Sequence, residues 1–554
     1  MHPPDPVHPK PSLQHPSPKE FPVTRRSLRH LLLAMVAALG LLAVACGGSS
    51  DSKADSSSSS DTSGSGSKAL NVAFTADMQV PDPDIFYEVE GNMVVTSAYE
   101  GLVAYRPSST EIEGALADSW TVSPDGLTYT FKLKPDVKFQ DGTPMDSAAW
   151  AESFKRRTDV NSAPAYMLAD VASTATPDPQ TFVVTLKQPV SAFLDYMAAP
   201  YGPKAVSPTV LKDKGGSDFA QSYLKDHSAG TGPYYISKFE PGTGYELTRN
   251  DTYWGPKPYF EKVNIAIIPE MSTQRLKLEG GELDMITHGL PVADIESFKK
   301  NPDFTVTDFP VLLKTVLASN PNKGPFTDQG LRLALQSAFD KTALTKEIYK
   351  GQAEPSTQIY PAGVMADGKA MDPNTVDLQN LKDAVAKLPA DKRKVDFAYS
   401  EDEGGTIPRL AETMQTTLTE AGLDVTVRGL PIAEVFDLPN NPDKAPDLLL
   451  WTLNPDAAHP DTWIRIFMNS TGALNYLVCP SPDGDKLMDQ GLAATDPAQV
   501  TDLYGQAGDA VVGTGCYTTI ADNKEIVVTR KGITGLTHQL PTAYTVRLKD
   551  LKEG

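Results

Sequence analysis

Cysteine and histidine are scarce in this chain, and three common catalytic motifs are missing from it. The sequence has three cysteines and eight histidines among 554 residues. Only His227, His288, His459 and His538 follow Ala45, and their wide separation does not predict a zinc site or a histidine-based catalytic cluster. The motifs Gly-x-Ser-x-Gly, His-Glu-x-x-His and Gly-x-x-x-x-Gly-Lys-Ser/Thr are all absent. We therefore expect no enzymatic activity, no cofactor and no resident metal.

Basic side chains are in deficit as well. The chain has 50 Lys and Arg against 70 Asp and Glu, which gives a formal net charge of -20. Residues 1–45 hold five basic and two acidic side chains, so the remainder of the chain carries -23. Nucleic acid requires basic grooves and anionic lipid attracts basic surfaces, so we expect neither to bind by charge. The length and the 40% apolar content predict a globular protein of two or three packed units. We expect it to be a monomer.

The apolar run at residues 31–45 is too short to cross a bilayer, since a spanning helix needs about 18 or more apolar residues. Arg25, Arg26 and Arg29 precede this run, and Cys46 follows it. This order is typical of a signal peptide, and we expect residues 1–45 to be removed. Residues 1–23 have no periodic pattern, and they are either an extended n-region or the product of a start codon placed too early.

Cys46 is the expected site of lipidation. Ala43 and Ala45 before the cysteine resemble a lipobox, although Ala43 stands where leucine is more common. Residues 46–67 then form a lipidated, Gly/Ser-rich tether, which holds the protein at the outer face of the cell membrane. The alternatives are a plain secretory signal or a free buried cysteine. Arg25 and Arg26 also resemble a twin-arginine signal, so the export route stays open.

Cys479 and Cys516 are the cysteines that remain after Cys46. Outside the cell such a pair commonly forms a disulfide, which we expect here. Two separate buried thiols are the alternative, because sequence does not supply the geometry that a disulfide requires.

The first half of the chain predicts antiparallel strands followed by a helix. Leu127, Tyr129, Phe131 and Leu133 alternate with polar residues, as in a half-buried strand that follows a Pro-Asp-Gly turn. Asp146 then precedes an apolar-patterned segment and is a good N-cap, so a helix is expected to start after it.

The second half predicts a βαβ unit. Residues 395–399 alternate as a strand, Leu410, Met414 and Leu418 recur at helical spacing, and residues 423–427 alternate again. A right-handed crossover between parallel strands is expected. The apolar run at residues 447–451 fits a central strand that is covered on both faces. The loop after that strand is a candidate ligand site, because open α/β sheets bind ligands at the carboxyl ends of their strands.

Four groups of short sequence blocks occur in a fixed order along the chain. They are ALADSW, SPDG, YTFKL and VKFQDG within residues 115–142, GTGPYYI and LTRNDTYW from residue 230 to residue 254, GGELD at residues 280–284, and NPNKGPF with LRLALQSAFD within residues 320–340. Together these blocks resemble the oligopeptide/dipeptide-binding family (family 5) of solute-binding proteins that serve ABC importers. The similarity extends from Leu70 to about Leu540.

The resemblance implies an α/β, two-lobed, periplasmic-binding-protein-like (type II) fold with an extra subdomain in the first lobe. Mapped onto this chain, the first lobe is expected at residues 68–312 and 521–554 and the second lobe at residues 313–520. Ligand would be enclosed between the lobes and delivered to the permease and ATPase subunits of an importer. An oligopeptide or dipeptide is the expected ligand, and a nickel complex, an opine or an oligosaccharide is the alternative.

The resemblance also implies an aspartate that holds the ammonium of a peptide, on the loop after the Trp-containing strand. Counting back from Pro460 selects Asp456, which we prefer, whereas counting forward from Trp451 selects Asn454. Asn454 would provide a neutral amide and make a free peptide N-terminus a poor ligand. Simple turn formation by Asn454-Pro455-Asp456 is the structural alternative.

Other residues are weaker candidates for ligand contact. Trp451 and Tyr476 form either an aromatic wall or part of the core, and Asn475 matches a family position near the cleft. Tyr99 and the segment at residues 81–83 resemble the border of the family's pocket, although turn and strand roles explain them nearly as well. Residues 403–406 could present helix amides to a carboxylate, but capping by Thr406 is the simpler role. His459 is interpreted as a loop residue rather than a metal ligand.

Overall fold

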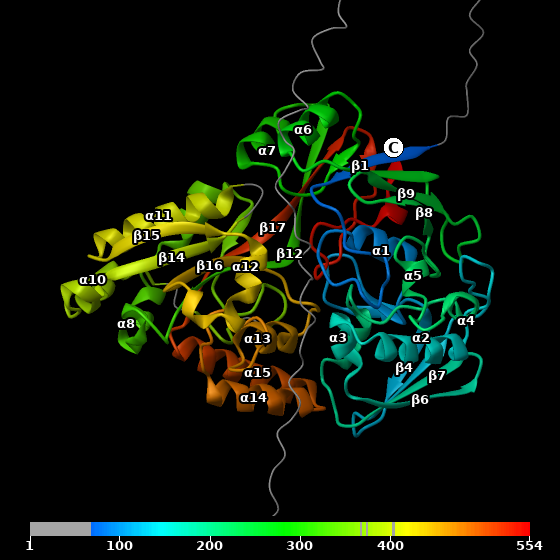
Figure 1. Ribbon diagram of the computed structural model, residues 1–554, viewed down its shortest axis with the longest axis horizontal. Helices are drawn as coiled ribbons and strands as arrows, with labels where there is room; N and C mark the ends of the chain where they lie inside the picture. The colour runs from blue at the N-terminus through cyan, green and yellow to red at the C-terminus, as the bar shows by residue number, and fades with distance from the viewer. Residues whose placement is uncertain (1–67, 366–367, 373–374, 402–404) are drawn as a thin grey trace, which may run out of the picture. The chain divides into compact units, whose positions relative to one another are not determined.

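The computed structural model describes residues 68–365, 368–372, 375–401 and 405–554, all of them within one unit, Gly66–Gly554 (Figure 1). The leader, Cys46 and the tether predicted for residues 46–67 lie outside the described residues. No helix in the described ranges combines the length and the apolar character that a membrane crossing requires.

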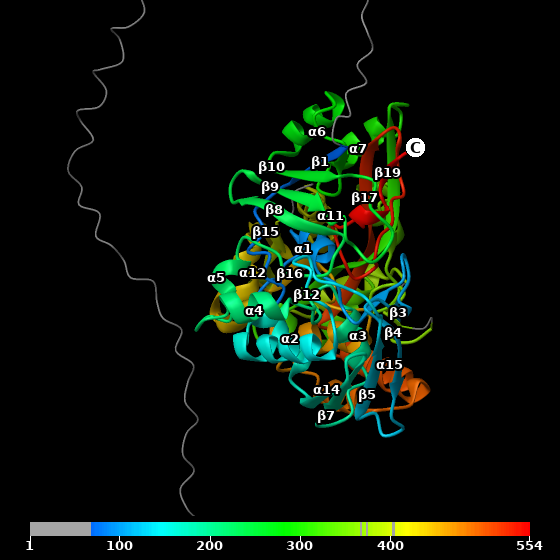
Figure 2. The same ribbon diagram turned by 90° about the vertical axis from the view of Figure 1, so that its right-hand side faces the viewer.

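One large mixed sheet organises the fold. In the described part of the chain it has eleven strands in the order β15-β14-β16-β12-β17-β11-β1-β10-β9-β8, with β13 paired to β17. Figure 2 shows β10, β9 and β8 side by side at one end of this order. The bounds of these strands are β15 Asp424–Leu430, β14 Lys394–Ser400, β16 Leu448–Leu453, β12 Phe304–Ser319, β17 Tyr517–Arg530, β11 Met285–Ile286, β1 Ala69–Phe74, β10 Lys262–Ile267, β9 Gly244–Arg249, β8 Tyr234–Glu240 and β13 Ala353–Pro355.

Two long antiparallel strands, β12 and β17, join the two ends of this sheet. The segment of β12 that includes Phe309 pairs with the end of β17 beside β11, whereas residues 314–319 pair with its beginning and with β16. The register shifts between Pro310 and Lys314. We call the part on the β11 side of this shift the first lobe and the part on the β16 side the second lobe. Figure 1 shows β12 and β17 between them.

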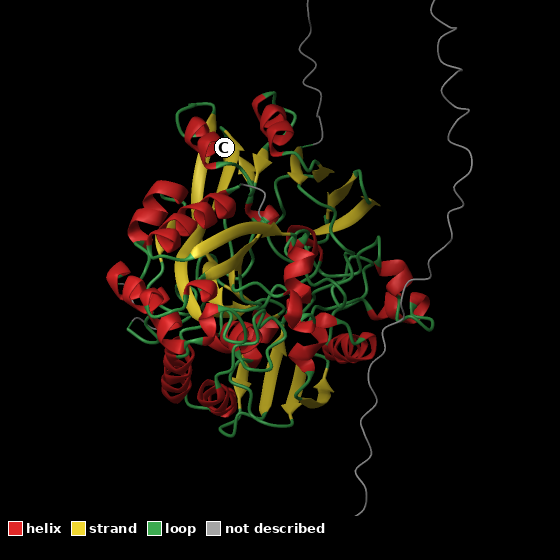
Figure 3. Cartoon of the chain, turned by 60° about the vertical axis from the view of Figure 1, so that its left-hand side comes forward, coloured by secondary structure: helices red, strands yellow, loops and turns green. Residues whose placement is uncertain are grey.

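The second lobe contains the predicted βαβ unit. β14 and β15 are parallel neighbours, and α11 (Thr406–Glu420) connects them, so this prediction is confirmed. Leu410, Met414 and Leu418 lie on the buried face of α11, as their helical spacing predicts. Helices surround the second-lobe strands in Figure 3. The other helices of this lobe are α8 (Gln329–Gln336), α9 (Lys341–Leu344), α10 (Leu378–Ala386), α12 (Ile432–Asp437), α13 (Pro460–Met468), α14 (Pro482–Ala493) and α15 (Pro497–Gly513).

β16 is the predicted central strand, and both of its faces are covered. Leu448 and Leu450 pack into the core that α8, α10 and α11 share, whereas Leu449 and Trp451 pack into the core beneath α13, α14 and α15. A disulfide joins Cys479 to Cys516 beside this second core, with a Cα–Cα distance of 6.4 Å. The loop after β16 is therefore attached to a strand that cannot move independently of the lobe.

The first lobe carries the extra subdomain that the resemblance implies. Within the described residues a four-stranded sheet has the order β4 (Ala117–Val122), β5 (Thr128–Leu133), β7 (Thr181–Leu186) and β6 (Val171–Asp178). β5 buries Tyr129, Phe131 and Leu133, and Asp146 caps α2 (Ser147–Val160) by accepting from Ala149 N, as predicted. The remaining elements are α1 (Asn92–Ala98), β2 (Val103–Tyr105), β3 (Ile112–Gly114), α3 (Phe193–Ala198), α4 (Pro208–Lys214), α5 (Gln221–Leu224), α6 (Met271–Glu279) and α7 (Val292–Phe298).

The C-terminal segment returns to the first lobe. Val528 at the end of β17 pairs with Ile286 of β11, and Leu540, Val546 and Leu551 join the first-lobe core. The short strands β18 (Ile533–Thr534) and β19 (Lys552–Glu553) pair with each other in this segment. The chain therefore crosses between the lobes on β12 and again on β17.

Candidate functional site

The loop after β16 lies against the first lobe. Its Ala457 and Ala458 are buried within the first-lobe core, and Ala458 N donates to the Tyr105 hydroxyl at 3.0 Å. The loop ends where His459 caps α13, with its Nδ1 accepting from Asp461 N at 3.2 Å. Two backbone N–H groups thus fix the end of the loop, Ala458 N to the first lobe and Asp461 N at the start of α13, and Asp456 lies just before them in the chain.

The Asp456 carboxylate bridges the lobes. Its Oδ2 accepts from the Tyr87 hydroxyl at 2.5 Å and from the Tyr166 hydroxyl at 2.6 Å, and both tyrosines belong to the first lobe. Tyr87 packs edge-to-face on Tyr201 at 5.0 Å between ring centroids, and Tyr166 packs on Tyr196 in the same manner at 5.7 Å. The two donors are held by aromatic packing, while Oδ1 has no partner among the described residues.

The electrostatics of this carboxylate fit a site for a cation. Desolvation raises the pKa of Asp456, and the two tyrosine hydroxyls oppose that rise only in part. Burial and the nearby Asp456 charge raise the pKa of Tyr87 and of Tyr166, so both hydroxyls stay protonated donors. No side-chain cation of the described ranges forms an ion pair with Asp456. A ligand ammonium would supply the missing positive charge.

Asn454, the alternative from the sequence, has a different environment. Its Nδ2 donates to Pro455 O at 3.1 Å and to Pro541 O at 3.5 Å. The amide is therefore occupied by backbone carbonyls, one of them in the C-terminal segment of the first lobe. This geometry favours Asp456 as the ligand contact.

Trp451 and Tyr476 lie in the second-lobe core rather than on an open wall. Trp451 is 1% exposed and Tyr476 is 3% exposed. The Trp451 ring stacks on Phe467 at 5.3 Å and meets Tyr476 edge-on at 5.7 Å. The sequence leaves two roles open for both residues, an aromatic wall or part of the core, and this packing supports the core role.

The side chains of Asn475 and Tyr99 form hydrogen bonds to loop backbone. Like Trp451 and Tyr476 they are buried, which argues against direct contact with a ligand. Asn475 Nδ2 donates to the carbonyls of Asn469 and Cys479, and its Oδ1 accepts from Cys479 N. The Tyr99 hydroxyl accepts from Ala229 N, and the side chain lies in the first-lobe core. Both side chains are almost fully buried, and their hydrogen bonds satisfy backbone groups of the adjoining loops.

The remaining candidates are positioned as follows. Asp82 of the segment at residues 81–83 is buried in an ion pair with Arg156 and does not border the cleft as an open side chain. Residues 402–404 lie outside the described residues, so the helix-terminus hypothesis concerns only Gly405, the N-cap, and the first turn of α11. His459 is buried, and the described residues contain no cluster of three His, Cys, Asp or Glu side chains that could hold a metal.

A cavity of about 370 Å³ lies between the lobes, and β12 and β17 form part of its wall. Ser400 and Thr452 line it from the carboxyl ends of β14 and β16, and His288 and Tyr544 line it from the first lobe. The Tyr544 ring stacks on the His288 ring with 4.0 Å between centroids. Burial lowers the pKa of His288 to about 4, so this imidazole is neutral at physiological pH. The cavity thus occupies the position that an open α/β sheet gives to ligands.

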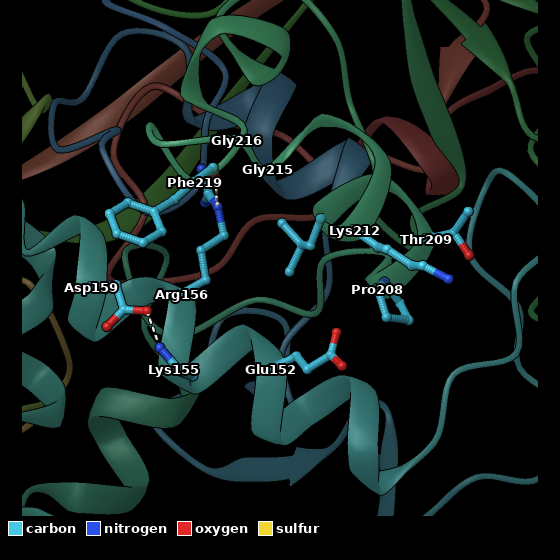
Figure 4. A pocket seen from close by; sticks show the side chains of 11 residues that line it. Glu152, Lys155, Arg156, Asp159, Pro208, Thr209, Lys212, Gly215, Gly216 and Phe219 are labelled. Carbon is cyan, nitrogen blue, oxygen red and sulfur yellow. Dashed lines mark hydrogen bonds and ion pairs between the residues drawn. The ribbon is translucent and has the colours of Figure 1, made fainter.

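A second hollow lies on the outer side of the first lobe, between α2 and α4 (Figure 4). Its volume is about 600 Å³, but three of its charged groups, Lys155, Arg156 and Asp159, already have protein partners. Lys155 pairs with Asp159, and Arg156 Nε donates to Phe219 O at 2.8 Å while its guanidinium pairs with Asp82. We assign no ligand to this hollow.

Sequence reasoning did not find Tyr87 or Tyr166. Each tyrosine lies in a short segment without a motif, and Asp456 is 369 residues from Tyr87 and 290 from Tyr166. No local pattern contains information about such a distant pairing. Only the return of β17 to the first lobe, together with the docking of the β16 loop, brings these three side chains together.

Comparison with known proteins gives consistent results. Residues 111–475 match a family model described as "Bacterial extracellular solute-binding proteins, family 5 Middle". The chain is 30% identical over 472 residues to the "Probable D,D-dipeptide-binding periplasmic protein DdpA" of Escherichia coli (strain K12), which covers 82% of this chain and 90% of that protein.

Solved structures show the same fold. The Helicobacter pylori periplasmic binding protein DppA in complex with the peptide STSA superposes with a TM-score of 0.74 at 23% identity, covering 88% of this chain and 98% of that chain. NikA from Brucella suis in complex with Fe(III)-EDTA gives a TM-score of 0.77 at 22% identity, covering 88% and 100%. The two-lobed fold with an inserted subdomain is therefore confirmed.

Proposed function

This chain belongs to family 5 of the bacterial extracellular solute-binding proteins, and on that premise we propose that it captures peptides between its lobes and delivers them to the membrane permease of an ABC importer. The observation that carries the peptide assignment is Asp456, a desolvated carboxylate at the lobe interface without a cationic partner in the described chain. The α-ammonium recurs in every peptide with a free N-terminus, so one such carboxylate serves ligands with different side chains. The name of the DdpA relative, which is described as a dipeptide-binding protein, supports the same class of ligand.

The proposed division of the chain follows the topology. The first lobe comprises residues 68–312 and 521–554, and the second comprises residues 313–520. The register shift between Pro310 and Lys314 and the irregular pairing around Asp522 support boundaries on β12 and β17. A ligand that contacts both lobes lowers the free energy of the closed arrangement relative to an open one. Closure, rather than catalysis, is then the protein's role, and we propose no enzymatic activity for it.

The function is tested by the solutes that the protein carries and binds. Mass spectrometry of small molecules released by denaturing the purified protein should detect short peptides. Calorimetry with a library of dipeptides to pentapeptides should detect binding, and small-angle scattering should show a smaller radius of gyration with the bound peptides than without them. Binding of metal chelates or sugars in the absence of any peptide binding would contradict the peptide assignment.

Peptide affinity is expected to depend on pH through Asp456. Because burial raises the pKa of this carboxyl, it becomes protonated at a higher pH than an exposed aspartate does, and protonation removes the charge that attracts an ammonium. Affinity for a peptide with a free N-terminus should therefore fall as the pH is lowered, by up to tenfold per pH unit below the pKa. Calorimetry with an N-acetylated analogue at the same pH values is the control, and its affinity should not follow this trend.

We propose that the protein is attached to the outer face of the cell membrane by lipid on Cys46. The basis is the order of features in the sequence: arginines come first, a short apolar run follows, and the small residues Ala43 and Ala45 stand just before Cys46. Replacing Cys46 with alanine should move the protein from the membrane fraction to the soluble extracytoplasmic fraction, as measured by fractionation and immunoblotting. Replacement of Ser49 with alanine is the matched control, and it should leave the protein with the membrane. Retention of the Cys46→Ala protein in membranes would contradict lipidation.

A further inference from the structure

Two polar atoms on the wall of the interlobe cavity have no hydrogen-bond partner in the described part of the chain. They are Oε1 of Glu525 on β17 and Nε2 of Gln352, which precedes β13. Buried polar atoms without partners are uncommon, because each has lost its hydrogen bonds to water and gained none in return. One is an acceptor and the other a donor, so a bound solute that offers both kinds of group would satisfy them together.

Glu525 is held rigidly while one of its oxygens stays unpaired. The side chain is 3% exposed, and its Oε2 accepts from Tyr544 N at 2.7 Å. Tyr544 has a φ of 61°, a left-handed conformation that a side-chain-bearing residue adopts only at a cost, and its ring stacks on His288. The carboxyl group is therefore fixed against the first lobe, and Oε1 is the oxygen left for a ligand.

No protein cation neutralises this carboxyl group. Its pKa is raised well above the usual value because burial penalises the charged form, and two backbone N–H groups oppose that effect. Lys524 is the neighbouring cation, but its Nζ pairs with Glu354 at 2.6 Å. Glu401 is the other acidic residue that lines the cavity, so when Glu525 is ionised the described lining carries two negative charges against the one positive charge of Lys524. A cationic group of the ligand would be attracted here, whereas a carboxylate would be repelled.

The position of Glu525 couples such a contact to closure. Glu525 pairs with Phe309 in the first-lobe ladder, one position before the Pro310–Lys524 pair at which the register shift between Pro310 and Lys314 begins. Ser400 and Thr452, which line the same cavity, belong to the second lobe. A ligand group at Glu525 therefore lies at the connection between the lobes, and it touches both when the cavity is filled.

We propose that Glu525 is a specificity-determining residue that accepts hydrogen bonds from a second cationic group of the ligand, an ammonium or a guanidinium, while Gln352 donates to a ligand carbonyl. The preferred solutes would then be peptides with a basic side chain in addition to a free N-terminus. This inference rests on the proposed function, because it takes the interlobe cleft to be the ligand site.

The test compares peptides that differ only in one charge. Calorimetry uses Ala-Lys-Ala with Ala-norleucine-Ala, and Ala-Ala-Lys with Ala-Ala-norleucine, so that side-chain length is matched at two positions. In the unmodified protein the lysine peptide of at least one pair should bind about 10- to 100-fold more tightly. Glu525→Gln should abolish that difference by weakening only the lysine peptide. Gln352→Leu, the matched variant on the same cavity, should weaken lysine and norleucine peptides equally.

Three outcomes would overturn the inference. One is equal affinity for lysine and norleucine peptides in the unmodified protein, which needs no variant and leaves peptide binding itself intact. Another is a lysine preference that persists in Glu525→Gln with an unchanged melting temperature. The third is a preference for Ala-Glu-Ala, which would mean that a protonated Glu525 donates to an acidic ligand.

A probe without a peptide backbone separates this inference from the proposed function. Thermal shift with 1,5-diaminopentane should raise the melting temperature of the unmodified protein and not that of Glu525→Gln. If no peptide binds but this diamine effect is present, the peptide assignment fails and the cation site remains. If peptides bind, but Glu525→Gln changes neither the melting-temperature shift with the diamine nor the affinity difference between lysine and norleucine peptides, the cation site fails and the proposed function remains.

Discussion

Replacing Asp456 with asparagine is expected to weaken the binding of a peptide with a free N-terminus by about 2–5 kcal/mol, which is roughly 30- to 5,000-fold in the dissociation constant. The amide retains the shape of the carboxylate and can still accept from the Tyr87 and Tyr166 hydroxyls, so the lobes keep their contact. What is lost is the negative charge that pairs with the ammonium. Calorimetry of both proteins with one tripeptide measures the difference.

N-terminal acetylation of the peptide separates recognition of the ammonium from a structural effect of the mutation. The unmodified protein should bind the acetylated tripeptide much more weakly than the free one, whereas Asp456→Asn should bind the two with similar affinity. Asn454→Ala is the matched control on the same loop, and it should change the affinity little. A large loss in Asn454→Ala with little loss in Asp456→Asn would reverse the assignment and make Asn454 the residue at the anchoring position.

The Tyr87 and Tyr166 hydroxyls give this carboxylate a role in closure. They come from the first lobe and reach a side chain of the second lobe, so their hydrogen bonds exist only when the lobes meet. Ala458 N and the Tyr105 hydroxyl form a further contact of the same kind. Oδ1 of Asp456 remains for the ligand. A bound ammonium would therefore strengthen an interface that the protein already forms, and its differential contact with the closed arrangement shifts the population toward that state.

Local periodicity predicted the parts of the fold that lie in consecutive residues. The alternation at Tyr129, Phe131 and Leu133 and the helical spacing of Leu410, Met414 and Leu418 each correspond to a regular element with one buried face. The apolar run after Asp447 became a strand with both faces covered, because helices pack on each side of it. These elements are determined by burial within a short segment, so the sequence contains the necessary information.

The candidate site was predicted less completely, because it is built from segments far apart in the chain. Counting from Pro460 indicated Asp456, but neither its tyrosine partners nor the cavity could be located without the path of β17. Trp451 and Tyr476 show the opposite difficulty, since aromatic residues beside a binding loop are as typical of a core as of a pocket wall. Glu525 gave no sequence signal, because a glutamate in a strand is normally exposed and its burial depends on the fold of residues 540–545.

The loop that carries Tyr87 depends on a buried ion-pair network, and breaking that network should cost a large part of the stability. Arg156 pairs with Asp82 at 2.6 Å and with Asp84 at 2.5 Å, and Arg157 pairs with Asp84 at 2.8 Å. These four side chains are at most 3% exposed. Arg156→Ala should lower the free energy of unfolding by about 3–5 kcal/mol, because it leaves Asp82 charged and buried without its partner. Urea denaturation followed by tryptophan fluorescence measures this loss.

The same variant should also weaken the ligand site, since Phe86 N donates to Asp82 O at 2.8 Å and Tyr87 follows directly. Burial already raises the pKa of Asp82, and loss of the Arg156 guanidinium would raise it further. The destabilisation should therefore shrink as pH falls, because protonation removes the unpaired charge. Arg106→Ala is the matched control, since its pair with Glu111 is 55% and 68% exposed and should contribute less than about 1 kcal/mol. An Arg156→Ala protein as stable as Arg106→Ala, with unchanged peptide affinity, would show that this network neither stabilises the first lobe nor positions Tyr87.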